Sequence, residues 1–406
     1  MAKKTSKKLK ILMLNYEFPP LGGGASPVSF ELAKGYVELG HSVDVVTMSY
    51  KGLPDFEVVE GINVYRVPSI RSKKEICYPW EMLSYIISAQ LFLQNHMKTH
   101  KYDINHTHFI IPTGIVSLWL KKKYGLEYII TSHGSDVPGF NTDRFKLLHT
   151  FTKPVLIEVC KNAKKVVSPS KYLLELINTN IIDTKSKGIV IPNGIYPDKF
   201  VPKKKKKVIL STGRLLPRKG FQYLIKAVSD EDIGYEVHIA GDGPMMQELK
   251  ELASKSKTKI IFHGWMNNKS KEYKELLETT AIYVLASEKE NASIALLEAM
   301  SAGCAVITTN ISGCPETIEN TGLVVEPRNS EQIYEALLKL DNKIFSDNIK
   351  KNAYNHLIKN LNPERLLKLF HLAIFGIKVS TIFCYSYYSL ARVIKIFNQP
   401  IFKKFI

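Results

Sequence analysis

Two cations in the second half of the chain have the type and spacing needed to bind a phosphorylated ligand. Arg214 and Lys219 lie in a segment bounded by Gly213 and Gly220, directly after a short apolar run. A guanidinium offers a planar pair of N–H groups to phosphate oxygens, and an ammonium is a compact point charge. The segment predicts an anion-binding loop; the alternative is a basic loop that only faces solvent.

Two glutamates, Glu290 and Glu298, are eight residues apart, at the start of an apolar stripe that ends before Gly303. The stripe predicts a helix that begins near Glu290, with free backbone N–H groups around Ser293 and Ile294. Glu298 would then lie just over two turns deeper, because eight residues rise about 12 Å. The amides could bind phosphate, and the deeper carboxylate could accept hydrogen bonds from ribose hydroxyls. Glutamates at this spacing are also common on surface helices.

A third candidate is the glycine run Gly22 to Gly24, between the first apolar run and a helix predicted to begin near Pro27. Glycines such as Gly23 and Gly24 let the backbone approach a phosphate or sugar, with a helix N-terminus behind them. The run is not GxGxxG, and no acid is placed to bind a dinucleotide. A flexible loop explains the run equally well.

Short apolar runs alternate with segments of helical period, which places these candidates in predicted elements. In the first half, strands are predicted at Ile11–Leu14, Val43–Val46, Val64–Val67, Ile104–Thr107, Tyr128–Thr131 and Val166–Ser168, and helices at Pro27–Leu39, Trp80–His96 and Thr113–Lys123. In the second half, strands are predicted at Val208–Ser211, Glu236–Ala240, Lys259–His263, Ile282–Leu285, Ala305–Thr308 and Leu323–Val325. Strands separated by single helices indicate βαβ units and parallel sheets.

The fold class predicted from this alternation is α/β, with two doubly wound domains. Their boundaries are 1–195 and 196–360, followed by a tail over 361–406. Open sheets of this kind bind ligands at the carboxyl ends of their strands, so two facing domains predict a cleft for two substrates. The lysine run 203–207 between the domains is expected to be a hydrated linker, because neighbouring like charges repel.

Composition restricts the class of protein further. The chain has 406 residues, 45% hydrophobic and 23% charged, which indicates a folded protein of more than one domain. Its five cysteines form no CxxC pair, which argues against a disulfide framework or thiolate zinc site and favours a reducing compartment. The basic N-terminus precedes an apolar run too short for a signal peptide, so a cytoplasmic protein is expected. The net charge of +18 favours an anionic partner, although a merely basic soluble enzyme is the alternative.

Four further segments complete a pattern that resembles a known family: Ser132 to Asp136, Pro192 to Ile195, Gly241 to Pro244, and Gly313 to Glu316. With the candidates above, the chain resembles the retaining GT-B glycosyltransferases of family GT4. The likeness runs from Ile11 to about Leu340 and is most specific in the second half, where the segments follow the family order. It implies a GT-B fold of two facing Rossmann-like domains. It also implies an enzyme of polysaccharide biosynthesis that moves a sugar from a nucleotide-diphosphate sugar to a glycan or lipid-linked acceptor, with retention of configuration.

The resemblance implies a role for each matching residue. Arg214 and Lys219 would neutralise the leaving diphosphate, and His133 and Glu290 would contact the transferred sugar. The rest of the sugar donor would be bound by Gly23, Gly24, Asn193, Asp242, Gly264, Ser293, Ile294 and Glu298. No cofactor or metal is expected, because the two cations and a helix N-terminus would carry the charge. Many relatives have Gly-Phe-Gly after the first glutamate, whereas this chain has Asn-Ala-Ser, so the sugar preference does not follow.

The C-terminal residues 361–406 carry seven Lys or Arg against one acid, Glu364. A helix from Pro363 to about Phe370 is predicted to cross back onto the first domain. Residues 369–391 predict a basic, aromatic helix that lies on an anionic membrane, since Lys378 near the middle of a span would cost roughly 3 kcal/mol. Packing of this segment against the protein body is the alternative. A peripheral protein on the cytoplasmic face of the membrane is therefore expected.

Two other functions compete with sugar transfer. A sugar-nucleotide epimerase would have the same fold, although the intact cation loop and glutamate pair favour transfer. A non-catalytic membrane or nucleic-acid binder would explain the net charge. No sequence signature of a nucleic-acid-binding fold is present, so nucleic acid is not an expected partner.

Overall fold

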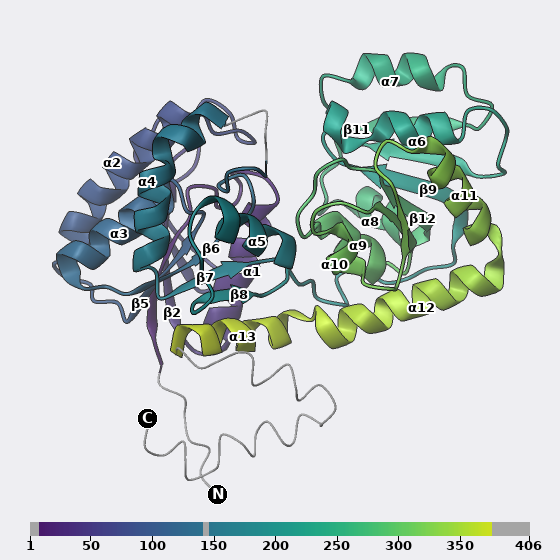
Figure 1. Ribbon diagram of the computed structural model, residues 1–406. Coiled ribbons are helices and arrows are strands. Elements are labelled where there is room, and N and C mark those ends of the chain that lie inside the picture. Colours follow the sequence, from purple (N-terminus) through teal and green to yellow (C-terminus); the bar gives the residue numbers. More distant parts are fainter. Residues whose placement is uncertain (1–7, 141–145, 376–406) are drawn as a thin grey trace, which may run out of the picture.

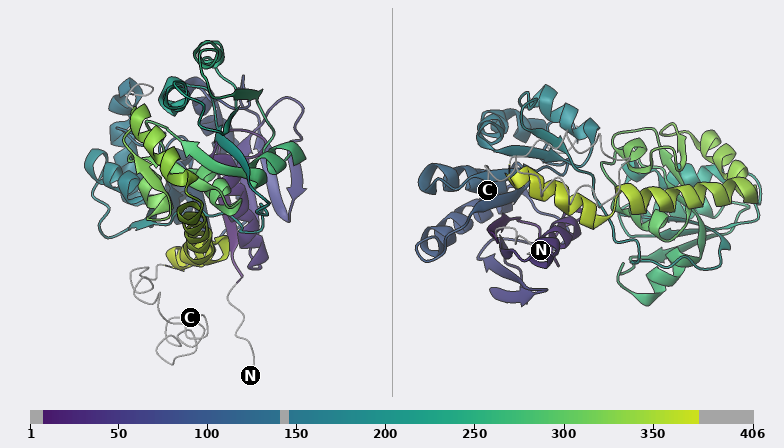
Figure 2. Two further views of the ribbon diagram at one scale, coloured as in Figure 1. Left: turned by 90° about the vertical axis from the view of Figure 1, so that its right-hand side faces the viewer. Right: turned by 90° about the horizontal axis from the view of Figure 1, so that it is seen from below.

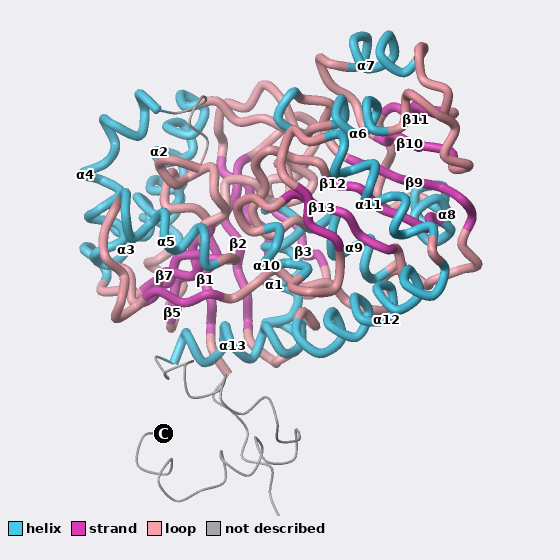
Figure 3. Tube along the Cα trace, turned by 45° about the vertical axis from the view of Figure 1, so that its right-hand side comes forward, coloured by secondary structure: helices cyan, strands magenta, loops and turns pink. Residues whose placement is uncertain are grey.

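The computed structural model describes residues 8–140 and 146–375 (Figure 1). Its strands form an eight-stranded sheet in the order β3-β4-β2-β1-β5-β6-β7-β8 and a six-stranded sheet in the order β11-β10-β9-β12-β13-β14. Within these ranges every strand pair is parallel except β3 with β4. Helices surround the strands of both sheets (Figure 3). The predicted α/β fold of two doubly wound domains is confirmed.

The first sheet contains the six strands predicted for it, each within two residues at either end. Its strands are β1 (Lys10–Leu14), β2 (Ser42–Met48), β3 (Phe56–Val59), β4 (Ile62–Val67), β5 (Ile104–His108), β6 (Tyr128–Thr131), β7 (Lys165–Ser168) and β8 (Gly188–Val190). Its helices are α1 (Ala25–Glu38), α2 (Pro79–His96), α3 (Thr113–Tyr124), α4 (Lys146–Asn162) and α5 (Lys171–Asn180). Strands β3 and β8 were not predicted, because β3 is half-exposed and has no continuous apolar run, and the three residues of β8 are too few to show a period.

The second sheet contains all the strands predicted for it. Its strands are β9 (Lys206–Thr212), β10 (Glu236–Ala240), β11 (Ile260–Gly264), β12 (Thr280–Leu285), β13 (Ala305–Thr309) and β14 (Leu323–Val325). Its helices are η1 (Pro217–Lys219), α6 (Phe221–Ala227), α7 (Met246–Ala253), α8 (Lys271–Thr279), α9 (Ile294–Ser301), α10 (Cys314–Ile318), α11 (Ser330–Asp341) and α12 (Lys343–Asn360). Helix α13 (Pro363–Phe375) follows.

The strand order reverses once in each sheet, between β1 and β5 and between β9 and β12. Loops that leave the two strands at such a point turn to opposite faces and leave a crevice, where ligands bind. The glycine run Gly22 to Gly24 follows β1, and His108 ends β5. Arg214 follows β9, and Glu290 follows β12. The fold therefore places the predicted site residues at its two reversal points.

The chain crosses between the domains twice. The first crossing follows β8, and the second lies where α12 of the second domain gives way to α13, which packs on α1 of the first (Figures 1 and 2). The two crossings are joined by a hydrogen bond from the Ile195 N–H to the Leu361 carbonyl, 3.2 Å long. A Cβ on Gly194 would lie 2.7 Å from that carbonyl oxygen, so only glycine fits between the crossings. The predicted boundary at 195/196 falls in the first crossing.

The predicted crossing helix is confirmed and is longer than expected, from Pro363 to Phe375. Its apolar side chains Leu366, Leu367 and Phe370 join a core cluster of the first domain. Most of the predicted membrane-binding segment 369–391 lies outside the described residues.

The expectation of a hydrated lysine run is wrong for one of its members, Lys205, which is partly buried, whereas Lys203 remains 45% exposed. Lys203 forms ion pairs with Glu275 and Glu278. Lys205 Nζ donates to the carbonyl oxygens of Glu278, at 2.9 Å, and Ala302, at 2.6 Å. Glu278 lies in the last turn of α8 and Ala302 caps the C-terminus of α9. Carbonyl groups at helix C-termini attract cations, so Lys205 fixes the linker to the second domain.

Candidate functional site

The two loops at the reversal point of the second sheet meet through an ion pair. Lys219 Nζ contacts Glu290 Oε2, and their side chains are only 20% and 21% exposed. Lys219 ends the one-turn helix η1, whereas Glu290 lies in the loop after β12. Arg214 lies in the same loop as Lys219, with its side chain exposed. The structure thus joins two predicted catalytic residues and leaves a guanidinium open to a ligand.

Three loops at the carboxyl edge of β9, β10 and β11 are joined backbone to backbone. The Leu215 N–H donates to the Asp242 carbonyl at 2.9 Å, and the Gly241 N–H donates to the Gly264 carbonyl at 2.7 Å. A Cβ on Gly241 would lie 1.8 Å from the carbonyl oxygen of Gly213, so this contact requires glycine. Asp242 and Gly264, two predicted ligand residues, therefore lie directly beside the cationic loop.

The predicted helix start at Glu290 is wrong. Helix α9 begins at Ile294, with Ser293 as its N-cap residue, and Glu290 lies in the preceding loop. The reason lies in the backbone: the Glu290 carbonyl, which would accept a hydrogen bond from the Ile294 N–H in such a helix, accepts instead from the Gly313 N–H at 3.2 Å. The Asn291 side chain contacts the first domain, where the Ser170 hydroxyl donates to its Oδ1 at 2.6 Å. The helical geometry expected between the two glutamates therefore does not apply, whereas the free N–H groups near Ile294 are present.

Glu298 is buried inside α9, and two partners hold its carboxylate. Lys199 Nζ donates to Oε1 at 2.8 Å, and the Tyr273 hydroxyl donates to Oε2 at 3.2 Å. Lys199 belongs to the first crossing, and Tyr273 belongs to α8. Neither partner was predicted, because each is far from Glu298 in the sequence. These two bonds use about half of the acceptor positions of a carboxylate, and the Glu298 side chain is only 6% exposed.

His133 belongs to a row of three histidines at the end of the first sheet. Its Nε2 lies 3.0 Å from Nδ1 of His108, and the rings of His106 and His108 are stacked. Burial lowers the pKa of His133 and of His106 to about 3 and also depresses the pKa of His108. All three rings are therefore neutral near pH 7. A neutral His133 can exchange hydrogen bonds with a sugar but adds no charge.

Side chains from both domains connect the two edges of the cleft. Asn291 Nδ2 donates to the His133 carbonyl at 3.5 Å, and Asn193 Nδ2 donates to the Ala292 carbonyl at 2.9 Å. Glu316 accepts hydrogen bonds from the Lys171 and Tyr172 N–H groups, at 2.7 and 2.9 Å. These N–H groups open α5, where the helix dipole favours a carboxylate. The contacts bring His133 and Asn193 next to the loop that carries Glu290.

Comparisons with known proteins agree with this arrangement. The family model described as "Glycosyl transferases group 1" matches residues 194–356, and the one described as "Glycosyltransferase Family 4" matches residues 22–199. An uncharacterised glycosyltransferase of Methanocaldococcus jannaschii is 30% identical over 358 residues, which cover 80% of this chain and 87% of the relative. The chain belongs to the GT4 glycosyltransferases.

Two further similarities concern a relative and a solved structure. The UDP-Gal:alpha-D-GlcNAc-diphosphoundecaprenol alpha-1,3-galactosyltransferase of Escherichia coli is 25% identical over 385 residues, 89% of this chain and 95% of that protein. The sucrose-phosphate synthase of Thermosynechococcus elongatus superposes with a TM-score of 0.76 at 18% identity, covering 90% of this chain and 98% of that chain. The structural likeness shows the GT-B fold, as predicted.

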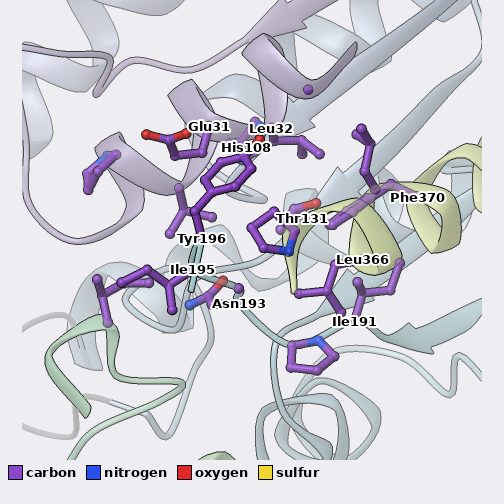
Figure 4. A pocket seen from close by; sticks show the side chains of 18 of the residues that line it. Glu31, Leu32, His108, Thr131, Ile191, Asn193, Ile195, Tyr196, Leu366 and Phe370 are labelled. Carbon is purple, nitrogen blue, oxygen red and sulfur yellow. The ribbon is translucent and has the colours of Figure 1, made fainter. Parts of the chain in front are cut away.

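The glycosyltransferase has a cavity of about 110 Å³ beside the site (Figure 4). Its walls come from α1, α13, the first crossing, the start of α9 and the ends of β5 and β6 at His108 and Thr131. Of the predicted residues it includes Asn193 and Ile294, but not Arg214, Lys219 or Glu290. It therefore adjoins the ion-paired loops and does not contain them.

The remaining predicted residues of the glycosyltransferase, Gly23 and Gly24, precede α1. A Cβ at either position would meet no atom within 4 Å. Packing within the described residues therefore gives no reason for glycine at these two places. The open space that they leave is available to a ligand.

The buried histidines should make the enzyme less stable in acid. The unfolded chain protonates His106 below about pH 6.5, but the folded protein does so only near its lowered pKa of about 3. The contribution of the neutral His106 ring to stability is thus complete above pH 6.5 and is lost as the pH falls toward 3. At pH 5 the loss from His106 should be about 2 kcal/mol. Urea unfolding at pH 7.5 and 5.0 should therefore show a smaller pH-dependent loss for His106→Gln than for the wild type; equal losses would contradict this.

Proposed function

We propose that this glycosyltransferase moves a sugar from a nucleotide-diphosphate sugar to a glycan or lipid-linked acceptor, with retention of configuration. The observation that carries the proposal is the Lys219–Glu290 contact at the reversal point of the second sheet, with Arg214 on the same loop. The name of the Escherichia coli relative supports a nucleotide sugar as one substrate and a lipid diphosphate as the other. An anionic membrane, at its cytoplasmic face, is the proposed location of such an acceptor.

The proposed chemistry is stabilisation of the leaving group. Negative charge grows on the diphosphate as the bond to the anomeric carbon breaks, so cations already in place lower the barrier. Lys219 has three N–H groups, enough to hold Glu290 and a phosphate oxygen together. Arg214 would bind the diphosphate as a fork, and the N–H groups of Ser293 and Ile294 would add the positive end of α9.

The proposed sugar and nucleotide contacts divide between the two glutamates. Glu290, at the loop, would accept hydrogen bonds from hydroxyls of the transferred sugar. Glu298, held by Lys199 and Tyr273, would accept them from the ribose. Asp242 and Gly264 would border the base, because their loops lie beside the cationic loop.

Residues of the first domain would meet the sugar from the opposite side. His133 would contact it as a neutral ring, Asn193 would bind beside Ala292, and Gly23 and Gly24 would let the ligand approach α1. Retention would follow if the acceptor attacks from the face that the diphosphate leaves. No metal or cofactor is part of the proposal, since side-chain cations and the α9 N-terminus supply the charge.

The test is a panel of nucleotide sugars, with binding scored by thermal shift and turnover scored by hydrolysis of the sugar donor in buffer with EDTA. At least one nucleotide sugar should raise the melting temperature and be cleaved without added metal. A panel with neither binding nor cleavage would refute the proposal. Release of an epimerised sugar without transfer would support an epimerase instead, and an inverted product anomer would refute retention.

Glu298→Gln should mainly weaken binding of the sugar donor. Glutamine keeps the shape of the side chain but loses the charge and one acceptor oxygen, so the KM for the nucleotide sugar should rise about tenfold. The kcat should change less than about threefold, since the ribose is held alike in ground and transition states. Steady-state kinetics measure both constants. The matched control is Glu275→Gln, which changes an exposed glutamate of α8. A fall in kcat at unchanged KM would contradict the ribose role.

A further inference from the structure

Helix α2 presents a row of large apolar side chains to solvent. They are 62%, 56%, 51% and 63% exposed, in the order Trp80, Leu83, Ile87 and Leu91. At 3.6 residues per turn these four positions fall within an arc of about 80°. The row therefore follows one side of the helix along most of its length.

The opposite side of α2 already anchors the helix to the protein. Tyr85, Ala89 and Leu93 are fully buried in a core cluster, and the Tyr85 hydroxyl donates to the Val46 carbonyl at 3.0 Å. No charged residue occurs from Met82 to Asn95. A surface helix normally carries charges on its outer side, so an uncharged outer side indicates an interaction surface.

Neighbouring helices extend this apolar region. Helix α3 packs between α2 and α4 on the outer flank of the first domain (Figure 1). On α4, Phe151 and Val155 are exposed one turn apart. Trp119 of α3 is partly exposed, with Lys123 above its ring. We name the exposed side chains of Trp80, Leu83, Ile87 and Leu91 the α2 surface.

Basic side chains border the α2 surface at both ends. Exposed lysines precede the helix at Lys73 and Lys74 and follow it at Lys98 and Lys101. Glu75 is the exposed acid in the stretch before the helix. The acids after α3 and on α4 are paired: Glu127 with Lys121 at 3.0 Å, and Glu158 with Lys122 at 3.2 Å. An apolar strip with lysines at its ends matches the interior and the anionic headgroups of a lipid surface.

We propose that the α2 surface docks the enzyme onto an anionic lipid bilayer, with the helix lying in the interface. No helix within residues 8–140 and 146–375 is long and apolar enough to cross a membrane, so α2 would rest on the bilayer. A second copy of the chain fits less well, because a symmetric contact would bring the lysines of both copies together. An anionic surface pairs with them instead.

Docking on the α2 surface would place the lipid next to the cleft. The loop before α2 contacts the glycine run, since the Gly22 N–H donates to the Lys74 carbonyl at 2.8 Å. Trp80 is the second residue of α2, which begins immediately after that loop. A lipid-linked acceptor in the same bilayer would thus lie close to the first reversal point. The inference rests on the proposed function only for this acceptor.

The first test uses the full chain with Ile87→Ser and Leu91→Ser together. Sedimentation with vesicles of phosphatidylglycerol and phosphatidylcholine should show binding about tenfold weaker than for the wild type. The matched control is Leu338→Ser with Ile344→Ser, two exposed aliphatic side chains on α11 and α12 of the second domain, and it should bind normally. Undiminished vesicle binding by the α2 variant would overturn the proposal.

Hydrolysis of the nucleotide sugar without vesicles should be unchanged in the α2 variant. That assay separates the two hypotheses: loss of vesicle binding with intact hydrolysis supports the α2 surface, and absence of hydrolysis in the wild type itself would refute only the proposed function.

A second test reads the position of Trp80 directly. The chain has three tryptophans, so Trp119→Phe with Trp265→Phe leaves Trp80 as the sole emitter. Brominated phosphatidylglycerol vesicles should quench its fluorescence, and high salt should reverse the quenching because the lysines are screened. Unquenched Trp80 on bound vesicles would overturn the proposal. A dimeric wild type and a monomeric α2 variant that bind vesicles equally well would also overturn the proposal. The α2 surface would then be an interface between copies of the chain.

Discussion

Lys219→Ala is expected to lower the kcat of sugar transfer by about 10²- to 10³-fold. Lys219 is one-fifth exposed and is held against Glu290, so its ammonium is fixed in place before a substrate arrives. Alanine leaves no charge to neutralise the departing diphosphate, and the Glu290 carboxylate would then repel it. The KM for the nucleotide sugar should change less, because the interaction strengthens as the charge develops.

The matched control for this result is Lys226→Ala, which removes an exposed lysine from α6 a few residues further along. Its kcat should remain within about twofold of the wild type. The double variant Lys219→Ala with Arg214→Ala should lower the kcat by less than the product of the two single reductions, since both cations act on one leaving group. A Lys219→Ala enzyme with kcat within threefold of the wild type would show that another group stabilises the diphosphate.

Gly220→Ala should lower the free energy of unfolding by about 3 kcal/mol. Gly220 has a φ of 74°, and a Cβ there would lie 1.9 Å from the Ala286 carbonyl oxygen. Part of the cost is the left-handed backbone, and the larger part is a clash that must move η1 away from the end of β12. The Glu288 N–H to Arg218 carbonyl bond, 2.8 Å long, should break with it.

Gly234→Ala separates the two costs. Gly234 also has a positive φ, 70°, but a Cβ there would come no closer than 3.9 Å to the Lys207 ammonium. This variant should lose only about 1 kcal/mol. Urea unfolding of both variants measures the difference, and donor hydrolysis should fall in Gly220→Ala because Lys219 shifts. Equal losses of stability in the two variants would contradict a steric clash at Gly220.

Strand positions could be predicted because burial on both faces leaves a continuous apolar run in the sequence. The loops that carry the candidate site residues could be predicted for a related reason, since parallel strands deliver their following loops to one edge. Arg214 and Glu290 were found in this way, whereas His133 was named through the resemblance to the GT4 family. The edge strand β3 and the short strand β8 were missed, because a half-exposed or three-residue strand has no such run.

The contacts that shape the site could not be predicted from local patterns. Lys199 is 99 residues away from its partner Glu298 in the sequence. Nothing in the sequence around either residue distinguishes Lys199 from the other lysines of the chain. The start of α9 was misplaced because the Glu290 carbonyl accepts a hydrogen bond from the distant Gly313 N–H and not from the next turn of a helix. The apolar outer side of α2 was hidden too, since a sequence period does not tell which side of a helix is covered.

The sequence by itself determined the α/β alternation, the family and the residue types at the strand ends. Those features are local: they depend on burial along a strand and on backbone conformation in the following loop. Tertiary structure alone decided that Lys219 reaches Glu290, that His133 is neutral beside His108, and that α9 begins at Ile294. Each of these depends on contacts between segments far apart in the sequence, which only tertiary packing brings together.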